Sequence, residues 1–280
     1  MNLYQASRCY FERSQRALLT SLLLSVILLL LTLLALIPST GFEDAILVSA
    51  IACTQLLQMW LRYRALYWVG RADTPRRMDQ LQSGLGLQPS PEKCARIEDE
   101  IGKCDSPVNP GYWRSQQPTG PRRMIEMILE SSFYTRSLAA KCQAFFFGIG
   151  SIGLALAAVA LIVSYRVRNA GQPNELISHV VLTVLIFFLT GDFWNAGLLY
   201  RDLREAADES HKQAFVLLRE GRFTQEAALE IALDYNTAVV QAPPLLTFRY
   251  LRTREATDEA FVRNYGQLLG LETSTPRKHQ

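Results

Sequence analysis

Four stretches of the chain are largely apolar over a length that fits a lipid bilayer, and the segments between them are strongly charged. About 20 apolar residues in a helix span the hydrocarbon core. The first stretch, residues 17–37 (ALLTSLLLSVILLLLTLLALI), carries no charge at all and is too long for the apolar region of a signal peptide. The other three stretches are residues 44–61, 144–165 and 176–200. The pattern therefore predicts an all-α membrane protein with four transmembrane helices.

The lengths of the connecting segments predict how these helices are grouped. A brief linker, PSTGFE, joins the first two helices, and a similarly short polar segment joins the last two. We therefore expect two transmembrane helical hairpins, at 17–64 and 144–200. The remaining parts are a cytoplasmic N-terminal arm at 1–16, a cytoplasmic insertion at 65–143, and a cytoplasmic helical region at 201–280 that ends in a disordered tail.

The segments outside the hairpins give weaker helical patterns. The centre of the insertion is rich in Pro, Gly and Ser, which favours a partly ordered linker with one short helix around residues 91–102. An amphipathic helix at 122–141 is expected to run along the membrane or to lead directly into the third span. In the C-terminal region, a helix should continue the fourth span as far as Gly221. Thr224 should cap a second helix, and a third should open at Pro243 and Pro244.

Lysine and arginine residues concentrate on one side of the predicted membrane. This bias sets the orientation of membrane proteins. Basic residues flank the outer ends of both hairpins, in the N-terminal arm and at 62–77, 122–141 and 201–212. The loop of the first hairpin has none, and the loop of the second has only Arg166 and Arg168. We therefore predict a multi-pass protein of the inner membrane with both termini in the cytoplasm; the net charge of +3 adds little to this.

The five cysteines are odd in number and scattered, and none forms a C-x-x-C pair. Two of them, Cys53 and Cys142, lie in or beside apolar runs. This distribution favours neither a disulfide framework nor a zinc site, and it indicates that the soluble parts face a reducing compartment. A pairing of Cys94 with Cys104 stays open.

Residues that could carry out catalysis do not occur in a recognisable pattern. The glycines of FGIGSIG fall inside a predicted span, where they favour close helix packing rather than phosphate binding. None of His179, His211 and His279 has a metal-ligating residue at the required spacing. We therefore predict that the protein is not an enzyme, uses no cofactor or metal, and binds no nucleic-acid polymer.

Polar residues at the depth of the lipid are the main candidate functional residues. Such residues are costly unless they face other helices or water. Thr54, Gln55 and Gln58 share one side of the second span. On the fourth span, His179, Thr183 and Thr190 share one side, whereas Asp192 and Asn195 share a different side. They could line a pore or form hydrogen bonds that hold the helices together. The small residues Ser151, Gly153, Ala155 and Ala157 of the third span should allow close helix packing.

The length of the fourth helix predicts the position of Asp192. If the fourth helix left the lipid at Gly191, its apolar part from Ile177 would be roughly 22 Å long, too short for a core of about 30 Å. Continuing the span to Leu199 fits the thickness of the core. We therefore expect Asp192 to lie below the headgroups, facing another helix or water.

Several segments resemble one protein family in their order along the chain. They are the arm LYQASRCYFERSQR, the element NPGYWRS in the insertion, the aromatic pair in ESSFYTRSL, and the C-terminal run LDYNTAVVQAPPLLTFRYLRTREATDE. Together with the two apolar hairpins, they resemble the SMODS-associating four-transmembrane effectors of bacterial cyclic-nucleotide-linked anti-phage defence. The chain departs from that family at Thr135, where an acidic residue is expected, and at Gln241, where an arginine is expected.

This resemblance implies an effector of the inner membrane. Activated by a signal nucleotide, such as a cyclic oligonucleotide, or by a signalling partner on the cytoplasmic side, it would form a homo-oligomer and permeabilise the membrane. The residues themselves leave two alternatives open: a constitutive ion channel or transporter, and a non-conducting membrane scaffold or sensor.

Overall fold

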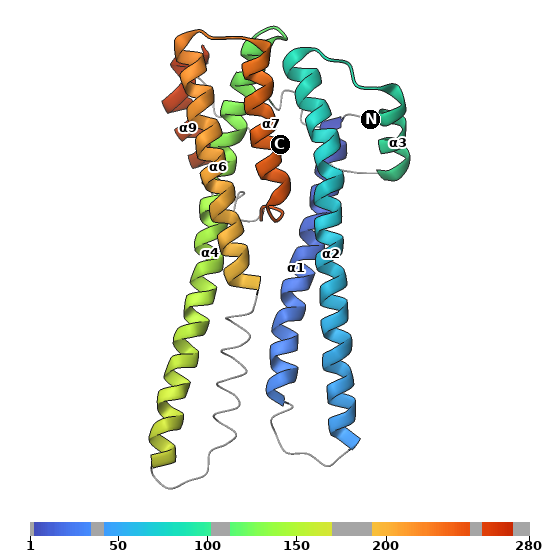
Figure 1. Cartoon of the computed structure of the whole chain (residues 1–280), viewed down its shortest axis with the longest axis vertical. Helices are drawn as coiled ribbons and strands as arrows, with labels where there is room; N and C mark the ends of the chain where they lie inside the picture. Colours follow the sequence, from blue (N-terminus) through green and yellow to red (C-terminus); the bar gives the residue numbers. More distant parts are fainter. Residues whose placement is uncertain (1–2, 35–41, 102–112, 170–191, 247–253, 271–280) are drawn as a thin grey trace. The chain divides into compact units, whose positions relative to one another are not determined.

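The computed structural model describes residues 3–34, 42–101, 113–169, 192–246 and 254–270 (Figure 1). Within these ranges all regular secondary structure is helical, which confirms the all-α prediction. The helices are α1 (Leu3–Leu34), α2 (Phe42–Leu85), α3 (Pro91–Ile101), α4 (Pro121–Asn169), α6 (Asp192–Glu220), α7 (Gln225–Gln241) and α9 (Arg254–Leu269).

The chain forms two compact units. Unit 1 comprises Met1–Ser14, Tyr67–Cys142 and Leu199–Gln280, and unit 2 comprises Gln15–Leu66 and Gln143–Leu198. Helices α1, α2, α4 and α6 each contribute residues to both units. The ranges of unit 2 lie close to those of the two predicted hairpins.

Within the part of the chain that the structure describes, two helical segments are long and apolar enough to cross a membrane, Leu3–Thr32 and Pro121–Ala155. They include residues 17–32 of the first predicted span, 17–37, and the start of the third. The second predicted span, 44–61, is helical within α2 but does not belong to a segment of this kind. Most of the fourth, 176–191, lies outside the described residues. An arrangement of four spans therefore stays a prediction.

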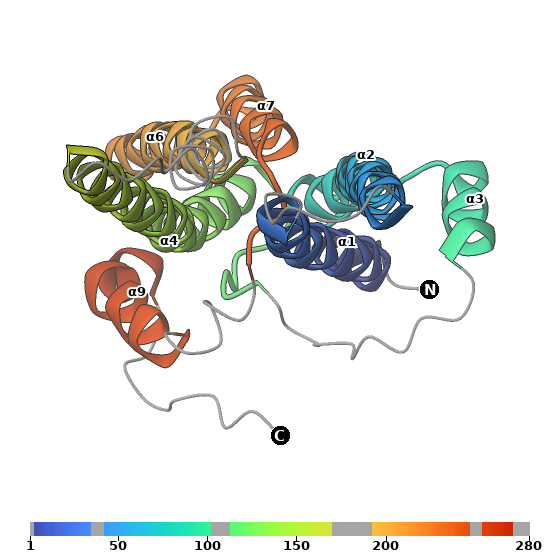
Figure 2. The same ribbon diagram turned by 90° about the horizontal axis from the view of Figure 1, so that it is seen from below.

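The core of unit 1 consists mainly of apolar side chains. Its larger cluster joins α4, α6, α7 and α9, and the side chains of Ile125, Ile128, Leu129 and Phe261 in it are fully buried. Figure 2 shows α4 between α6 and α9. Because neighbours surround it, all residues from Met124 to Glu130 are buried. The predicted amphipathic helix at 122–141 therefore packs within the core of unit 1 and continues directly into the next segment of α4.

A second cluster in unit 1 joins the beginning of α1 to α2 and α3. It contains Ala6, Tyr10, Ala72 and Ile97, and the ring of Tyr10 stacks on that of Trp68 with centroids 5.6 Å apart. The short helix expected near residues 91–102 is present as α3, because its two apolar residues, Ile97 and Ile101, pack in this cluster.

Cys9 of this cluster is disulfide-bonded, whereas Cys53 and Cys94 are free thiols. The sequence favoured reduced cysteines, and this prediction is wrong for Cys9. The reason is tertiary: α1 begins by packing on α3, nearly 90 residues away in the chain, and no local pattern indicates that contact.

The turns of the C-terminal region follow the local signals of the sequence. Gly221, at φ +70°, follows the last residue of α6, and the N–H of Arg222 donates to the carbonyl of Leu217. Thr224 caps α7, since its side-chain oxygen accepts from the N–H of Ala227. Residues 242–246 are not helical, so the expected helix does not open at Pro243 and Pro244. Helix α9 comprises Arg254–Leu269.

Candidate functional site

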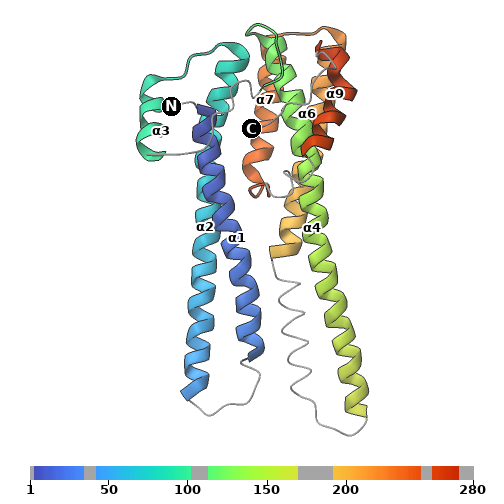
Figure 3. The ribbon, with the colours of Figure 1, turned by 180° about the vertical axis from the view of Figure 1, so that it is seen from behind.

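Polar side chains line the contact between α1 and α2 in unit 2, where the two helices run side by side (Figures 1 and 3). Ser21 and Ser25 of α1 are 1% and 2% exposed, and Gln58 of α2 is 6% exposed. The side-chain amide of Gln58 donates to Ser25 Oγ at 2.5 Å. Arg62 Nε donates to Ser21 Oγ at 3.2 Å. We call these four residues the polar seam.

The hydroxyls of the polar seam that accept hydrogen bonds from α2 belong to α1, whose backbone can orient them. Ser25 Oγ also donates to the carbonyl of Ser21 at 3.1 Å, so it keeps a partner within α1. Thr54, one turn before Gln58, donates to the carbonyl of Ala50 in its own helix at 2.7 Å. Within one chain, Gln58 therefore acts as an interhelical hydrogen-bond donor.

The outward surface of the same two helices is apolar. Leu23 of α1 is 61% exposed, and Leu56, Met59 and Trp60 of α2 are 67%, 61% and 53% exposed. A water-soluble helix pair buries its apolar side chains and exposes its polar ones. Here the arrangement is reversed, and a contiguous apolar surface of this kind indicates contact with lipid or with other protein. Arg64 lies over the ring of Trp60 at 5.3 Å, an amphipathic pair suited to a membrane interface.

The other contact in unit 2 joins α4 to α6 through glycine and aromatic residues. The rings of Phe147 and Trp194 lie 5.0 Å apart. A Cβ at Gly197 would lie 2.6 Å from the Phe147 ring, and one at Gly150 would lie 3.2 Å from Trp194. An alanine at position 197 would therefore require the Phe147 ring to move, whereas one at position 150 would require only a small shift of Trp194.

The predicted packing residues have different environments. Gly153 is buried, whereas Ser151 and Ala155 are exposed, and the side chain of Ala157 is not described. The sequence analysis missed Gly150 and Gly197. The signal for Gly150 was present in FGIGSIG, but helical spacing alone could not select among its glycines.

The remaining predicted polar residues are not brought together in the described structure. Gln55 and Asn195 are exposed to the surroundings of the chain. Asp192 is the first residue of α6, and its side chain is not described. His179, Thr183 and Thr190 lie outside the described residues.

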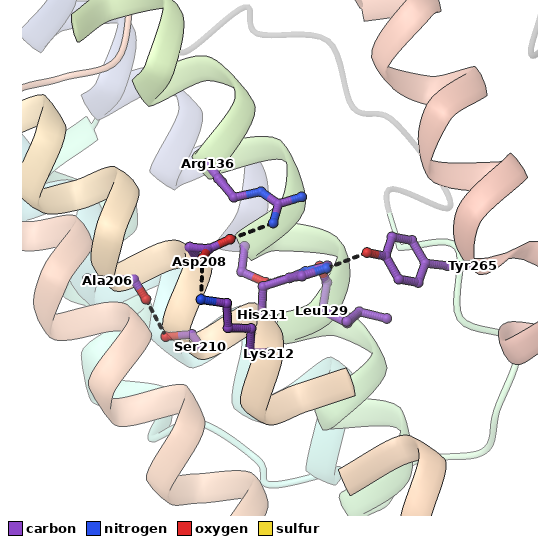
Figure 4. A network of polar contacts seen from close by, with 9 residues as sticks. Leu129, Arg136, Ala206, Asp208, Ser210, His211, Lys212 and Tyr265 are labelled. Carbon is purple, nitrogen blue, oxygen red and sulfur yellow. Dashed lines mark hydrogen bonds and ion pairs between the residues drawn. The ribbon is translucent and has the colours of Figure 1, made fainter. Parts of the chain in front are cut away.

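Unit 1 contains a second polar site, between α4 and α6 (Figure 4). Arg136 of α4 donates to Asp208 Oδ1 of α6 at 2.6 Å, and Lys212 contacts Asp208 Oδ2 at 2.7 Å. The hydrogen bonds from Lys212 and Arg136 hold the pKa of Asp208 below its ordinary value. Asp208 is therefore ionised at neutral pH and shared between two cations.

His211 lies one turn further along α6 and is buried, 4% exposed. Its Nδ1 is 3.3 Å from the carbonyl of Leu129, and its Nε2 is 2.6 Å from the hydroxyl of Tyr265 on α9. A carbonyl can only accept, so Nδ1 carries the proton and Nε2 accepts from Tyr265. Burial, assisted by the charge of Arg136, lowers the pKa of His211 to about 4. The imidazole is neutral at physiological pH.

A cavity of about 460 Å³ adjoins this site. Its lining residues come from α4 and α6: Arg136, Ser137, Ala140, Arg201, Arg204, Glu205 and Asp208. We call it the arginine cavity. A second, more open cavity of about 380 Å³ lies beside His211, Lys212 and Tyr265. Among the described residues, no group of His, Cys, Asp and Glu side chains is arranged to hold a metal ion.

Comparison of the chain with protein-family models, curated proteins and solved structures gave no match. Its function must therefore be argued from its own residues.

Three of the sequence segments that carry the family resemblance contact one another in unit 1. Arg114, which follows Trp113, pairs with Glu130 of α4 at 3.5 Å and with Asp258 of α9 at 3.2 Å. Asp258 also accepts from the hydroxyl of Tyr134 at 2.6 Å. These segments are separate motifs in the sequence, and the structure joins them in one partly buried polar cluster.

A similar contact involves Thr135, the position at which the chain departs from the family pattern. Its hydroxyl lies 2.7 Å from that of Tyr235 on α7. The next residue of α7, Asn236, donates to the side chain of Gln80 on α2 at 2.9 Å. These pairs are separated by 100 and 156 residues in the chain, so no local pattern could have identified them.

Proposed function

We propose that the protein is a membrane-embedded effector that permeabilises the inner membrane after activation from the cytoplasmic side, as in anti-phage defence. The observation that carries this proposal is the reversed α1–α2 pair, with Gln58, Ser25 and Ser21 inside and leucines outside. Bilayer lipid is the solvent in which this arrangement is favourable, since polar groups are then paired and apolar groups face acyl chains.

The proposal requires a polar path across the bilayer, and the seam does not supply one in a single chain. Gln58 already donates to Ser25 and is almost fully buried. By contrast, Gln55 on the same helix is exposed. An exposed amide at lipid depth is costly until another subunit or water covers it. We therefore propose that homo-oligomers form with Gln55 facing the shared interior, while Gln58 maintains each hairpin.

Activation is proposed to begin in unit 1. This unit holds a helical core that joins α4, α6, α7 and α9. An anionic signal such as a cyclic oligonucleotide, or a protein partner, would act on α4 and α6. Both helices continue into unit 2, so a change in their packing can be transmitted along continuous backbone.

The experiment is a planar-bilayer recording of the purified full-length protein, with and without candidate cyclic oligonucleotides. We expect conductance that depends on the activator and is reduced strongly by Gln55→Leu. Ser49→Leu provides a control on the same helix, since Ser49 is also exposed but was not assigned to the path. Insertion of both variants should be verified first by membrane fractionation.

The result separates the three functions. Activator-dependent conductance that Gln55→Leu reduces and Ser49→Leu spares supports the effector. Equal conductance without any activator indicates a constitutive channel or transporter. An absence of conductance in a correctly inserted protein, under every activator, contradicts both. It favours a non-conducting scaffold, which the intrachain pairing of Gln58 with Ser25 also fits.

A further inference from the structure

The arginine cavity has the chemistry of a phosphate site. Its lining includes the guanidinium groups of Arg136, Arg201 and Arg204. A guanidinium presents a planar fork of N–H donors that matches two oxygens of one phosphate. We propose that the cavity binds the phosphodiester group of an anionic lipid or of a soluble phosphate compound. The part of this proposal that concerns lipid rests on the membrane insertion proposed above.

The present partners of Arg201 and Arg136 can be exchanged for a ligand. Arg201 contacts Asp202 at 3.0 Å and Glu205 at 3.7 Å, and these carboxylates are 59% and 70% exposed. Ion pairs between exposed side chains contribute little to stability. A phosphate could therefore replace them at small cost.

Arg136 can likewise exchange its present partner, Asp208, for a phosphate. At present Asp208 accepts from Arg136 at 2.6 Å and is also held by Lys212 at 2.7 Å. If Arg136 turns towards a phosphate, Asp208 keeps Lys212 as its partner. The exchange therefore leaves no carboxylate unpaired. An unpaired carboxylate would make the exchange unfavourable.

The charges of the lining limit the kind of phosphate. The three arginines are accompanied by two carboxylates, Glu205 and Asp208, so the positive excess is small. A singly charged phosphodiester fits this excess better than a polyanion, which the carboxylates would repel. Phosphatidylglycerol carries such a group.

The position of the cavity in the chain favours a lipid as the source. Arg201 and Arg204 directly follow the predicted hairpin at 144–200, and the α4 residues of the cavity directly precede it. At 1.5 Å per residue, Arg204 lies roughly 6 Å beyond the end of that hairpin, a distance similar to the depth of the headgroup layer. Basic pockets at the cytoplasmic ends of transmembrane helices bind anionic headgroups.

The test uses the full-length protein in detergent and native mass spectrometry with added phosphatidylglycerol or phosphatidylcholine. We expect retention of phosphatidylglycerol over phosphatidylcholine, and a loss of about tenfold in this preference for Arg201→Gln/Arg204→Gln and for Arg136→Gln. The matched control is Arg219→Gln/Arg263→Gln, which removes two exposed arginines of α6 and α9 that do not line the cavity. Calorimetry with glycerophosphoglycerol, the soluble headgroup, forms the second arm.

The arms distinguish the sources. A lipid preference that the cavity variants lose and the control keeps supports a lipid ligand. Calorimetric binding that follows the same variants, without any lipid preference, supports a soluble phosphodiester. Indistinguishable behaviour of wild type, cavity variants and control in both arms overturns the proposal. If the glutamine variants do not fold, Arg201→Lys/Arg204→Lys retains the charge but not the fork, and the same loss of preference is expected.

Failure of the membrane proposal would look different. A protein recovered entirely from the soluble fraction would contradict membrane insertion, while calorimetry with glycerophosphoglycerol would still test the cavity itself.

Discussion

The neutral, buried His211 makes the stability of unit 1 depend on pH. In the folded chain the pKa of His211 is about 4, and in an unfolded chain a histidine has a pKa of about 6.5. Between these values the unfolded chain binds the extra proton, so stability rises with pH. The contribution is fully present above about pH 6.5 and is lost as the pH falls towards 4. Linkage gives a loss of about 2 kcal/mol between pH 7 and pH 5.

The groups around His211 explain why the loss of stability at low pH is assigned to its imidazole. Its Nε2 accepts from Tyr265 and its Nδ1 donates to Leu129, so a second proton would be buried with the imidazole, would displace the hydrogen bond from Tyr265, and would meet the charge of Arg136. Asp208 stays ionised throughout pH 5–7 because its pKa is lowered by Lys212 and Arg136. Burial raises the pKa of Asp79, which would change stability in the opposite direction at lower pH.

The assay is thermal unfolding of the full-length protein in a nonionic detergent, followed by tryptophan fluorescence at pH 7, 6 and 5. A loss of about 2 kcal/mol should lower the Tm by roughly 4–8 °C in a protein of this size. His211→Gln keeps hydrogen-bonding groups but cannot titrate. Its Tm should be lower at pH 7 and nearly constant down to pH 5, while the contributions of Asp79 and Asp208 stay in both proteins. Parallel decreases in the two proteins would refute the assignment to His211.

Three further predictions concern the cap, the packing and the topology of the chain. Thr224→Ala removes the cap of α7 and should lower the free energy of unfolding by about 1 kcal/mol. The control Thr237→Ala, at an exposed site within α7, should cause no loss because alanine is the better helix former. Equal losses in the two variants would contradict the role of Thr224 as a cap. Gly197→Ala should lower the free energy of unfolding by roughly 1–3 kcal/mol through the clash with Phe147. The control Gly148→Ala meets no atom within 4 Å and should be neutral or stabilising. A tolerated Gly197→Ala would show that α4 and α6 are further apart. A green fluorescent protein fused to the C-terminus should fluoresce if the arginines place it in the cytoplasm, whereas activity of an alkaline phosphatase fusion instead would favour the oxidising compartment that the Cys9 disulfide suggests.

Features specified by a few neighbouring residues were predictable from the sequence. Gly221 and Thr224 end one helix and begin the next because an αL glycine and a capping hydroxyl act within a single turn. The all-helical class followed from apolar runs of bilayer length. The long apolar segment of α1 was identified in the same way, since a run without charges needs no tertiary information.

Features that depend on which helices become neighbours were not predictable. The sequence identified Gln58 as a polar residue at lipid depth, but its partner Ser25 is 33 residues away and looked like an ordinary small residue of an apolar run. The burial of residues 124–130 required several surrounding elements. The disulfide of Cys9 was not predicted either, because its residue packs in a cluster that joins distant segments.

A single helix, α1, shows why the two units need different surroundings. Near its beginning, the apolar Tyr10 is buried and the charged Arg8 is partly exposed, as in a protein in water. About four turns later the relation is reversed: Ser25 is 2% exposed and Leu23 is 61% exposed. The hydrophobic effect would drive Leu23 inward if water surrounded this part of the helix, and nothing in the polar seam would compensate for that cost. The reversal therefore requires an apolar surrounding beyond about residue 15. A bilayer provides that surrounding for both faces of the hairpin at once, whereas a soluble partner would have to cover α1 and α2 together.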